Sequence, residues 1–117
     1  PDMLGEIMPL LGIVGLDKAR LELDATLVPE EVARYVVGVV RKTRVIDGVM
    51  LGASSRAAIH LMSATKAHAR LEGREAATIE DAREMAPYVL THRLIIEDDD
   101  LRPEDALAEA IESPIGF

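Results

Sequence analysis

Gly52-Ala53-Ser54-Ser55-Arg56-Ala57 is a glycine-led turn that opens a long helical pattern and places an arginine in its first turn. The start of a helix collects unpaired backbone N–H groups and the positive end of the helix dipole, so it suits anions. Ser54 or Ser55 can supply the N-cap oxygen. Arg56 opposes the dipole at a cost of about 0.3–1 kcal/mol when exposed, and an anionic partner reverses that cost. A solvated arginine beside a capped helix explains the same residues, so Arg56 is a candidate anion ligand only.

Apolar residues at helical spacing lie on both sides of this turn. Upstream, Pro29-Glu30-Glu31 makes a favourable first turn, because proline and acidic residues both suit the start of a helix. The buried face of this helix is predicted at Val32, Val36, Val39, Val40 and Thr43. The central helix is predicted from Ser54 to Glu72, ending at Gly73. Its wide apolar stripe predicts burial on more than one side and comprises Ala58, Ile59, Leu61, Met62, Ala64, Thr65, Ala69 and Leu71.

Two shorter helices are predicted nearer the C-terminus. Thr78-Ile79-Glu80-Asp81 has the spacing of a capping box, with aspartate in the position of the usual glutamate. Pro87 lies inside the following helical pattern and predicts a kink or a frayed last turn. The final helix begins at Arg102-Pro103-Glu104-Asp105 and ends at Ser113-Pro114. The predicted inward residues of these two helices are Ile79, Ala82, Met85, Ala86, Val89 and Leu90, then Ala106, Leu107, Ala110 and Ile111.

Length and composition limit the fold class. A chain of 117 residues forms one domain at most, and with 3% aromatic residues its core is aliphatic, which is typical of helices. We therefore expect an all-α fold, a small helical bundle. The absence of cysteine excludes disulfides and thiolate chemistry. Because the chain begins at Pro1, we expect a processed or excised piece of a longer protein. Met3–Leu16 has no basic leader and is too short to span a bilayer, so we expect a cytoplasmic protein with no membrane partner.

The negative charge is concentrated at one end of the chain. Residues 97–117 hold eight acidic residues and one basic residue, Arg102, for a net charge of −7. Residues 1–96 carry a net charge of −1. An acidic tail repels DNA and RNA, and the body shows no basic stripe with interleaved aromatic residues. The sequence therefore predicts no nucleic-acid partner.

Several patterns that imitate catalytic sites do not meet the requirements of those sites. No G-x-x-x-x-G-K-[ST] loop is present to cradle a triphosphate. Leu94–Asp100 imitates the apolar strand and acids that position magnesium in ATPases, but it follows a helix and is interpreted as a helix exit with a solvated acidic run. His60 and His68 are two turns apart, about 12 Å, which is too far for one metal ion. No serine has a candidate base at motif spacing, so the chain alone predicts neither a hydrolase nor a metal site.

Four stretches, taken in order, resemble a known family. They are Leu51-Gly-Ala-Ser-Ser-Arg-Ala-Ala-Ile59, Ala67-His-Ala-Arg-Leu-Glu-Gly-Arg-Glu75, Ala77-Thr-Ile-Glu-Asp-Ala82 and Ala86-Pro-Tyr-Val-Leu-Thr-His-Arg-Leu94. Together they resemble the C-terminal lid domain of MoxR-type AAA+ ATPases over roughly residues 28–96. The family usually has Gly-Ala-Ser-Pro-Arg at the central turn, and Ser55 stands here where proline is common. Proline pre-sets the backbone at this position, so Ser55 loosens the turn but leaves the arginine in place.

The resemblance implies both a role and a set of partners. Arg56 matches the sensor-2 arginine, which is a catalytic and nucleotide-binding residue that reaches the terminal phosphates when the lid closes. ATP and Mg²⁺ are then expected in the parent protein, with none held by this fragment alone. The implied partners are an AAA+ core domain in cis, neighbouring subunits of a ring, and a protein client that is matured or remodelled.

The resemblance also implies an organisation of the chain. We expect a linker or edge segment at residues 1–27, a lid-like helical domain of the AAA+ type at 28–96, and an acidic tail with a short helix at 97–117. The bundle is expected to include one very short strand pairing, between residues 49–51 and 76–78, that directs Arg56. The alternative interpretation is a free-standing helical interaction module that binds a protein through its acidic tail and the exposed edge of its central helix.

Overall fold

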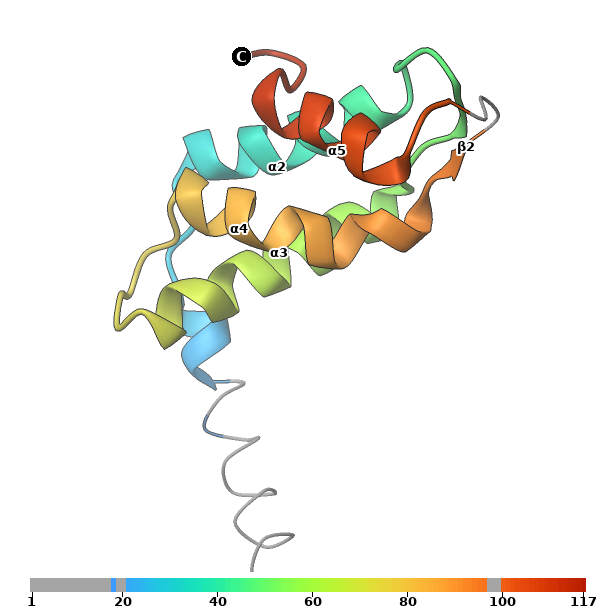
Figure 1. Ribbon diagram of the computed structural model, residues 1–117. Coiled ribbons are helices and arrows are strands. Elements are labelled where there is room, and N and C mark those ends of the chain that lie inside the picture. Colours follow the sequence, from blue (N-terminus) through green and yellow to red (C-terminus); the bar gives the residue numbers. More distant parts are fainter. Residues whose placement is uncertain (1–17, 19–20, 97–99) are drawn as a thin grey trace, which may run out of the picture.

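The computed structural model describes residue 18, residues 21–96 and residues 100–117. In chain order the elements are α2 (Glu30–Thr43), β1 (Val49–Leu51), α3 (Ser55–Leu71), α4 (Ile79–Leu90), the 3₁₀ helix η1 (Thr91–Arg93), β2 (Ile95–Ile96) and α5 (Pro103–Glu112). Residues 21–25, ahead of α2, are also helical. Helix α2 packs against α3, α4 and α5, and α3 and α4 run side by side (Figure 1). The prediction of an all-α bundle with one very short strand pairing is confirmed.

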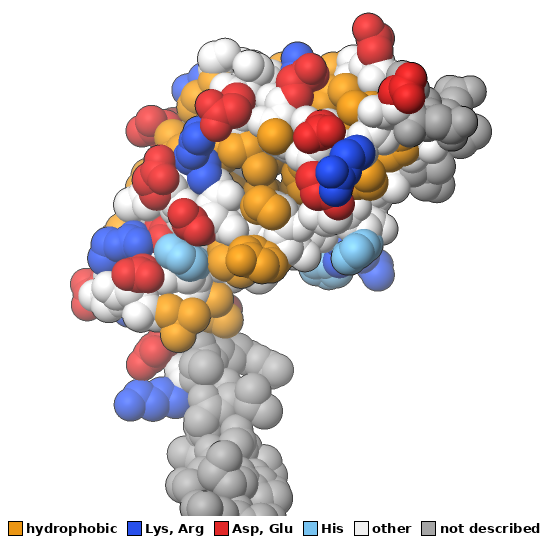
Figure 2. Space-filling model, viewed as in Figure 1, with side chains coloured by type: hydrophobic (Ala, Val, Ile, Leu, Met, Phe, Trp, Pro, Cys, Tyr) orange, Lys and Arg blue, Asp and Glu red, His pale blue; other side chains and the backbone are white. Residues whose placement is uncertain are grey.

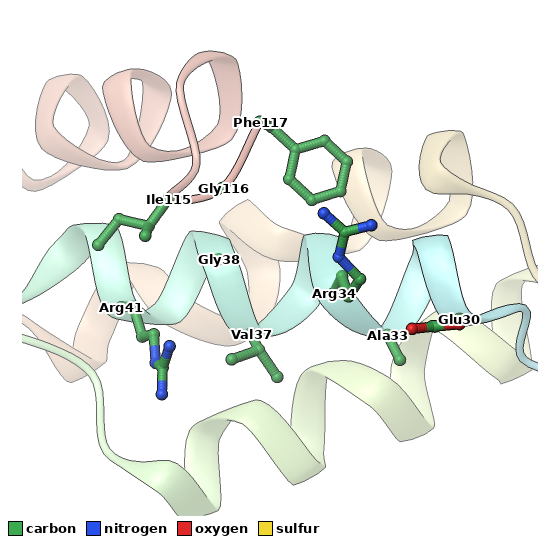
Figure 3. Close-up of a pocket in the computed structure, with 9 residues that line it drawn as sticks. All are labelled: Glu30, Ala33, Arg34, Val37, Gly38, Arg41, Ile115, Gly116 and Phe117. Atoms are coloured by element: carbon green, nitrogen blue, oxygen red, sulfur yellow. The ribbon is translucent and has the colours of Figure 1, made fainter.

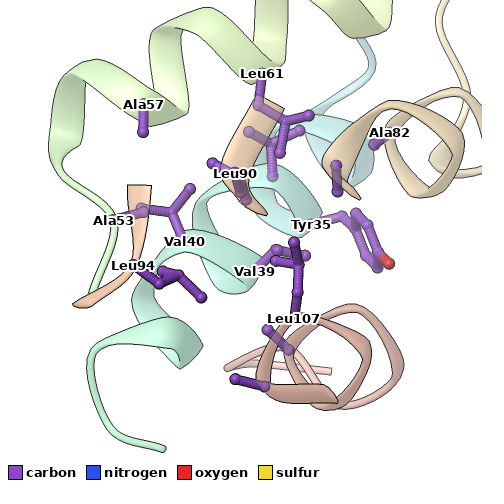
Figure 4. Close-up of a cluster of buried hydrophobic side chains, with 14 of the residues drawn as sticks. Tyr35, Val39, Val40, Ala53, Ala57, Leu61, Ala82, Leu90, Leu94 and Leu107 are labelled. Atoms are coloured by element: carbon purple, nitrogen blue, oxygen red, sulfur yellow. The ribbon is translucent and has the colours of Figure 1, made fainter. Parts of the chain in front are cut away.

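The core lies where one face of each helix meets the others (Figure 4). Its fully buried side chains include Val36 and Val39 from α2, Leu61 from α3, Leu90 from α4 and Leu107 from α5. The predicted inward faces of α2, α4 and α5 are confirmed, since their members are buried or packed against this core. Small residues on α4 and α5 let the helices approach closely, and the buried ones are Ala82, Ala86, Ala106 and Ala110.

The predicted stripe on α3 is wrong in its width. Only Ala57, Leu61, Thr65 and Ala69 are fully buried, at strict four-residue spacing. Ile59 is 65% exposed and Leu71 is 86% exposed. Helix α3 is covered by α4 and α2 on one side. Ala58 and Met62 are partly buried at the edge of that side, whereas Ile59 and Leu71 face outward.

The strand pairing joins different residues from those expected. β1 pairs antiparallel with β2, with Val49 opposite Ile96. Residues 76–78 do not pair with β1; Ala76 instead forms a parallel bridge with Leu27. The reason is the length of α3: its 17 residues separate its two ends by about 25 Å, and the loop into α4 leaves from the far end. The chain returns to the start of α3 only after α4, so β2 is the available partner.

Residues 95–96 also correct the interpretation of Leu94–Asp100 as a helix exit. The chain leaves η1 at the buried Leu94 and forms β2 before the acidic run. Residues 97–99 lie outside the described part of the chain, as does the Met3–Leu16 segment. Pro87 does not end α4, which continues to Leu90 and then tightens into η1.

Helix α5 and the C-terminal segment are held against α2. The buried Tyr35 hydroxyl donates to the carbonyl of Ile111 at 2.7 Å, and the Ile115 N–H donates to the carbonyl of Gly38 at 3.2 Å. A Cβ at Gly38 would lie 2.5 Å from the Ile115 oxygen. Gly38, which costs helix stability in isolation, therefore allows the C-terminal segment to lie directly on α2.

A buried carboxylate holds the start of α4. The Thr78 hydroxyl accepts from the Asp81 N–H at 3.3 Å, and the Asp81 carboxylate accepts from the Thr78 N–H at 2.7 Å, which completes the predicted capping box. Asp81 is fully buried and also accepts two hydrogen bonds from Arg74, at 2.6 and 2.8 Å. The His68 ring Nδ1 lies 2.6 Å from the same carboxylate. This cluster joins the end of α3, the loop and the start of α4.

The charge of Asp81 is stabilised by these partners. Burial by itself raises the pKa of the Asp81 carboxyl. The hydrogen bonds from His68 and Thr78 and the charge of Arg74 outweigh burial, so the pKa lies below its ordinary value. A depressed pKa in the folded state contributes stability above the unfolded pKa, and that contribution is lost as the pH falls through the folded pKa.

Replacing Asp81 is therefore expected to destabilise the chain. Asp81→Asn should lower the free energy of unfolding by about 2–3 kcal/mol, because Arg74 and His68 lose their charged partner. Thr78→Ala, which removes only the cap hydroxyl, should cost about 1 kcal/mol. Urea unfolding at pH 7 measures both.

The matched control is Asp105→Asn in the exposed first turn of α5, which should change the free energy by less than about 0.5 kcal/mol. The gap between wild type and Asp81→Asn should shrink as the pH falls below about 4, where the unfolded carboxyl becomes protonated. A gap that stays constant down to pH 2 would contradict the role given to the charge.

Candidate functional site: the start of helix α3

The first turn of α3 is fixed by its own cap. Ser54 is the N-cap residue, and its hydroxyl accepts from the Ala57 N–H at 3.3 Å. The structure thus decides between the two serines that the sequence offered. Ser55 is the first helical residue and is exposed, so the serine in place of the usual proline leaves the helix start at the expected position.

The turn ahead of this cap is attached to the end of α2. The buried Thr43 hydroxyl accepts from the Ala53 N–H at 2.9 Å and donates to the Val40 carbonyl at 2.6 Å. The Arg44 Nε donates to the Ala53 carbonyl at 2.8 Å. Both backbone groups of Ala53 are therefore satisfied by residues at the end of α2. This pair of contacts sets the direction in which α3 leaves α2.

Gly52 makes that contact possible. A Cβ at this position would lie 2.7 Å from the Arg44 nitrogen and 2.7 Å from the Thr43 carbonyl carbon. Both are backbone atoms, so they move only if the end of α2 moves. Position 52 therefore requires glycine for close approach of two backbones.

Arg56 lies in the exposed first turn of α3. Within the described part of the chain it has no hydrogen-bond or ion-pair partner. Its five N–H donors are therefore available to an external anion. A cavity of about 220 Å³ lies beside this turn, and its lining comprises Val37, Val40, Arg41, Arg44, Ser55 and Ala58. Positive charge is thus present on both helices at this end of the molecule, which suits an anionic ligand.

A larger hollow of about 370 Å³ lies on another face of α2 (Figure 3). Its floor is Val37 and Gly38, and Ile115 and Phe117 form one wall. The Arg34 guanidinium lies over the Phe117 ring, 5.5 Å from the ring centre. This hollow is mostly apolar, its charged lining residues are Glu30, Arg34 and Arg41, and it does not include Arg56. It offers no evident chemistry.

The histidines have separate environments. His68 belongs to the buried Asp81 cluster, whereas the His60 ring contacts Arg93 on the surface. Across the described ranges, no group of three or more histidine, cysteine or acidic residues is placed to hold a metal ion. The described helices also include none that is long and apolar enough to cross a membrane.

Sequence reasoning did not identify the residues that position Arg56. Thr43 was assigned to the apolar face of its helix, and the contacts of Arg44 and Gly52 were not predicted. Thr43 and Arg44 are 13 and 12 positions from Arg56, and Gly52 is four positions from it; no motif spacing links the three to one another. The glycine after a predicted strand and before a predicted N-cap is the one available signal.

The chain is similar to known proteins in sequence and in structure. A family model described as the AAA lid domain matches residues 41–114, from the last turn of α2 through α5. The uncharacterized protein YeaC of Bacillus subtilis is 37% identical over 82 residues, which cover 70% of this chain and 25% of that protein. The crystal structure of a candidate ATPase from Cytophaga hutchinsonii matches with a TM-score of 0.74 at 25% identity, over 80% of this chain and 32% of that one. The chain thus spans about a quarter to a third of the length of these two proteins.

Gly52→Ala should disturb the attachment of α3 to α2. The added methyl group forces the end of α2 away from the turn, so the free energy of unfolding should fall by about 1–3 kcal/mol. Ser55→Ala, three residues later and exposed, is the control and should change it by less than about 0.5 kcal/mol. Urea unfolding of the 117-residue chain measures both, and equal values for the two variants would contradict the close approach.

Proposed function

Because the chain belongs to the AAA lid domain family, we propose that it closes over ATP bound by a core domain of the same longer protein. In this proposal Arg56 contacts the terminal phosphates of the nucleotide in the closed state. The proposal rests on an exposed arginine that has no partner among the described residues. The helix start that carries this arginine is attached to the end of α2 by hydrogen bonds to the N–H and the carbonyl of Ala53. The residues also fit the ligand: guanidinium and N–H donors suit phosphate oxygens.

Arg56 would act by electrostatics and by position. Phosphoryl transfer depends mostly on placing charge around the transferred group, so an arginine brought by a mobile domain changes both the rate and the domain geometry. The attachment through Thr43 and Arg44 makes the arginine move with the whole lid. The presence of the γ-phosphate would therefore bias the position of the lid, and lid position would report the nucleotide state.

The roles that we propose for the core and the lid differ because of the residues that this chain contains. It has no phosphate loop, and its described residues offer no acidic cluster for Mg²⁺. The core would bind the triphosphate and Mg²⁺, and the lid would add one further cation. We extend the proposal to the MoxR type, in which neighbouring subunits of a ring use the lid movement to remodel a client protein. The four stretches that resemble that family support this extension.

Arg56→Ala in the longer protein should lower ATP hydrolysis by about 10- to 100-fold, since a charge-assisted contact to phosphate is worth about 1.5–3 kcal/mol. Arg56→Lys should restore only part of the rate, because lysine lacks the planar fork that grips two oxygens. The measurements are the steady-state rate of ATP hydrolysis by the longer protein and the melting temperature of the isolated 117-residue chain.

The control is Arg102→Ala, an exposed arginine ahead of α5 that pairs with Glu104 at 3.4 Å. It should leave hydrolysis unchanged. Wild-type hydrolysis by Arg56→Ala would refute the phosphate role. A large loss of melting temperature in the isolated Arg56→Ala chain would instead make Arg56 a structural residue.

The isolated 117-residue chain should fold and be largely helical, yet neither hydrolyse ATP nor bind it measurably. One arginine at a helix start provides too few contacts to hold a nucleotide without a phosphate loop. Circular dichroism and a coupled ATPase assay test this. Turnover above contaminant level that is abolished by mutating the chain's own residues would overturn the lid proposal.

A further inference from the structure

The Thr91-His92-Arg93 stretch ends α4 and has no role in the function proposed so far. Arg93 lies on η1 and is exposed. Its Nε donates to the Val89 carbonyl at 2.9 Å, and its Nη2 lies 2.8 Å from the Nδ1 of His60. The arginine therefore spans from the end of α4 to the second turn of α3, four residues beyond Arg56.

The chemistry of this contact fixes the state of His60. A guanidinium group has donors only, so the Nδ1 of His60 is the acceptor. In the tautomer that accepts this bond the proton is on Nε2, which remains a donor. Two of the five N–H groups of Arg93 are used within the described chain, and the other donors remain available. Both residues thus present hydrogen-bond donors at an exposed surface.

These donors lie on the same side of α3 as Arg56. Residues four apart on a helix are neighbours, with their Cβ atoms about 6 Å apart, so His60 lies directly above Arg56. The same helix contains no acidic residue between Ser55 and Leu71, although the whole chain has a net charge of −8. In Figure 2, histidine and basic side chains lie together at the lower right of the folded body, whereas those at the lower left lie among acidic side chains.

Like charges placed near one another repel, so the cluster is less favourable without a counter-ion. The acidic residues of this chain are abundant elsewhere, notably in the first turn of α5. A residue that only joined α3 to α4 would need to donate hydrogen bonds to His60 and to Val89. It would not need to carry a full positive charge near Arg56. An arginine here is better explained if an anion faces both cations.

We propose that Arg56, Arg93 and His60 form one phosphate-binding site, in which Arg93 is a second cationic ligand and His60 a neutral donor. The ligand class is the polyphosphate end of the nucleotide, so this inference rests on the proposed function. It adds Arg93 and His60 to the nucleotide contacts of the lid. The lid then grips phosphate oxygens from two helices, α3 and η1, and closure requires that α3 and α4 keep their relative position.

The test compares four variants of the longer protein by kcat/KM for ATP. Arg93→Ala should lower it about tenfold, the effect of one exposed charge-assisted contact, and His60→Ala about two- to threefold. Arg93→Lys keeps the charge and should recover part of the loss. Arg93→Gln keeps an N–H donor for His60 without the charge, and it should be as impaired as Arg93→Ala.

The Arg93→Gln variant distinguishes a phosphate ligand from a residue that only links α3 to α4. If Arg93 only joins α3 to α4, Arg93→Gln will have wild-type kcat/KM, and the inference is overturned even if Arg93→Ala fails to fold. A double variant, Arg56→Ala with Arg93→Gln, should lose less than the product of the two single losses, because both residues contact one anion. Independent losses that multiply would also overturn it.

Failure of this inference is distinguishable from failure of the proposed function. If Arg56→Ala impairs hydrolysis and Arg93→Gln does not, the lid role stands and the second cation is rejected. If neither variant changes kcat/KM, both are rejected. Arg102→Ala serves again as the exposed-arginine control, and the melting temperature of each isolated chain shows that the variants are folded.

Discussion

The hydrogen bonds between Ala53 and the end of α2 are the constraint on which the rest of the arrangement depends. Thr43 and Arg44 satisfy the N–H and the carbonyl of one residue, so the chain has a single way to leave α2 and begin α3. The direction of α3 then sets where α4 returns, and the return of α4 brings β2 beside β1. Helix α5 packs on both α2 and α4.

The α3–α4 pair is fixed at its two ends by different chemistry. At the far end, the buried Asp81 accepts hydrogen bonds from Arg74 and Thr78 and contacts His68, so a charge is sheltered and fully paired. At the near end, the contacts are the short β1–β2 pairing and the exposed Arg93–His60 hydrogen bond. The far end is therefore a structural joint. At the near end the side chain of Arg56 is exposed and has no partner among the described residues.

The distribution of charge agrees with this division. Helix α3 carries no acidic residue, whereas α5 has acidic residues in its first turn and ends at Glu112, which pairs with Arg83 at 2.5 Å. The acidic tail thus includes a helix that packs on α2 and α4 through Ala106, Leu107 and Ala110. The match to the AAA lid domain also continues through this helix to residue 114. The surface of α3 is therefore free of acidic residues, whereas α5 carries several.

The sequence by itself determined the helices, their caps and the lid family, because these depend on residues close together in the chain. The capping box at Thr78, the N-cap serines and the inward faces of α2, α4 and α5 were all predictable from short-range spacing, and the resemblance to an AAA+ lid is confirmed by the family match. The ligand role of Arg56 stays a prediction. Only the tertiary structure decided which strand pairs with β1, which side of α3 is exposed, and what positions Arg56. Those outcomes follow from the length of α3 and from the contacts of Thr43, Arg44 and Gly52 across a turn. The sequence has no periodic pattern that would identify the partners in such contacts.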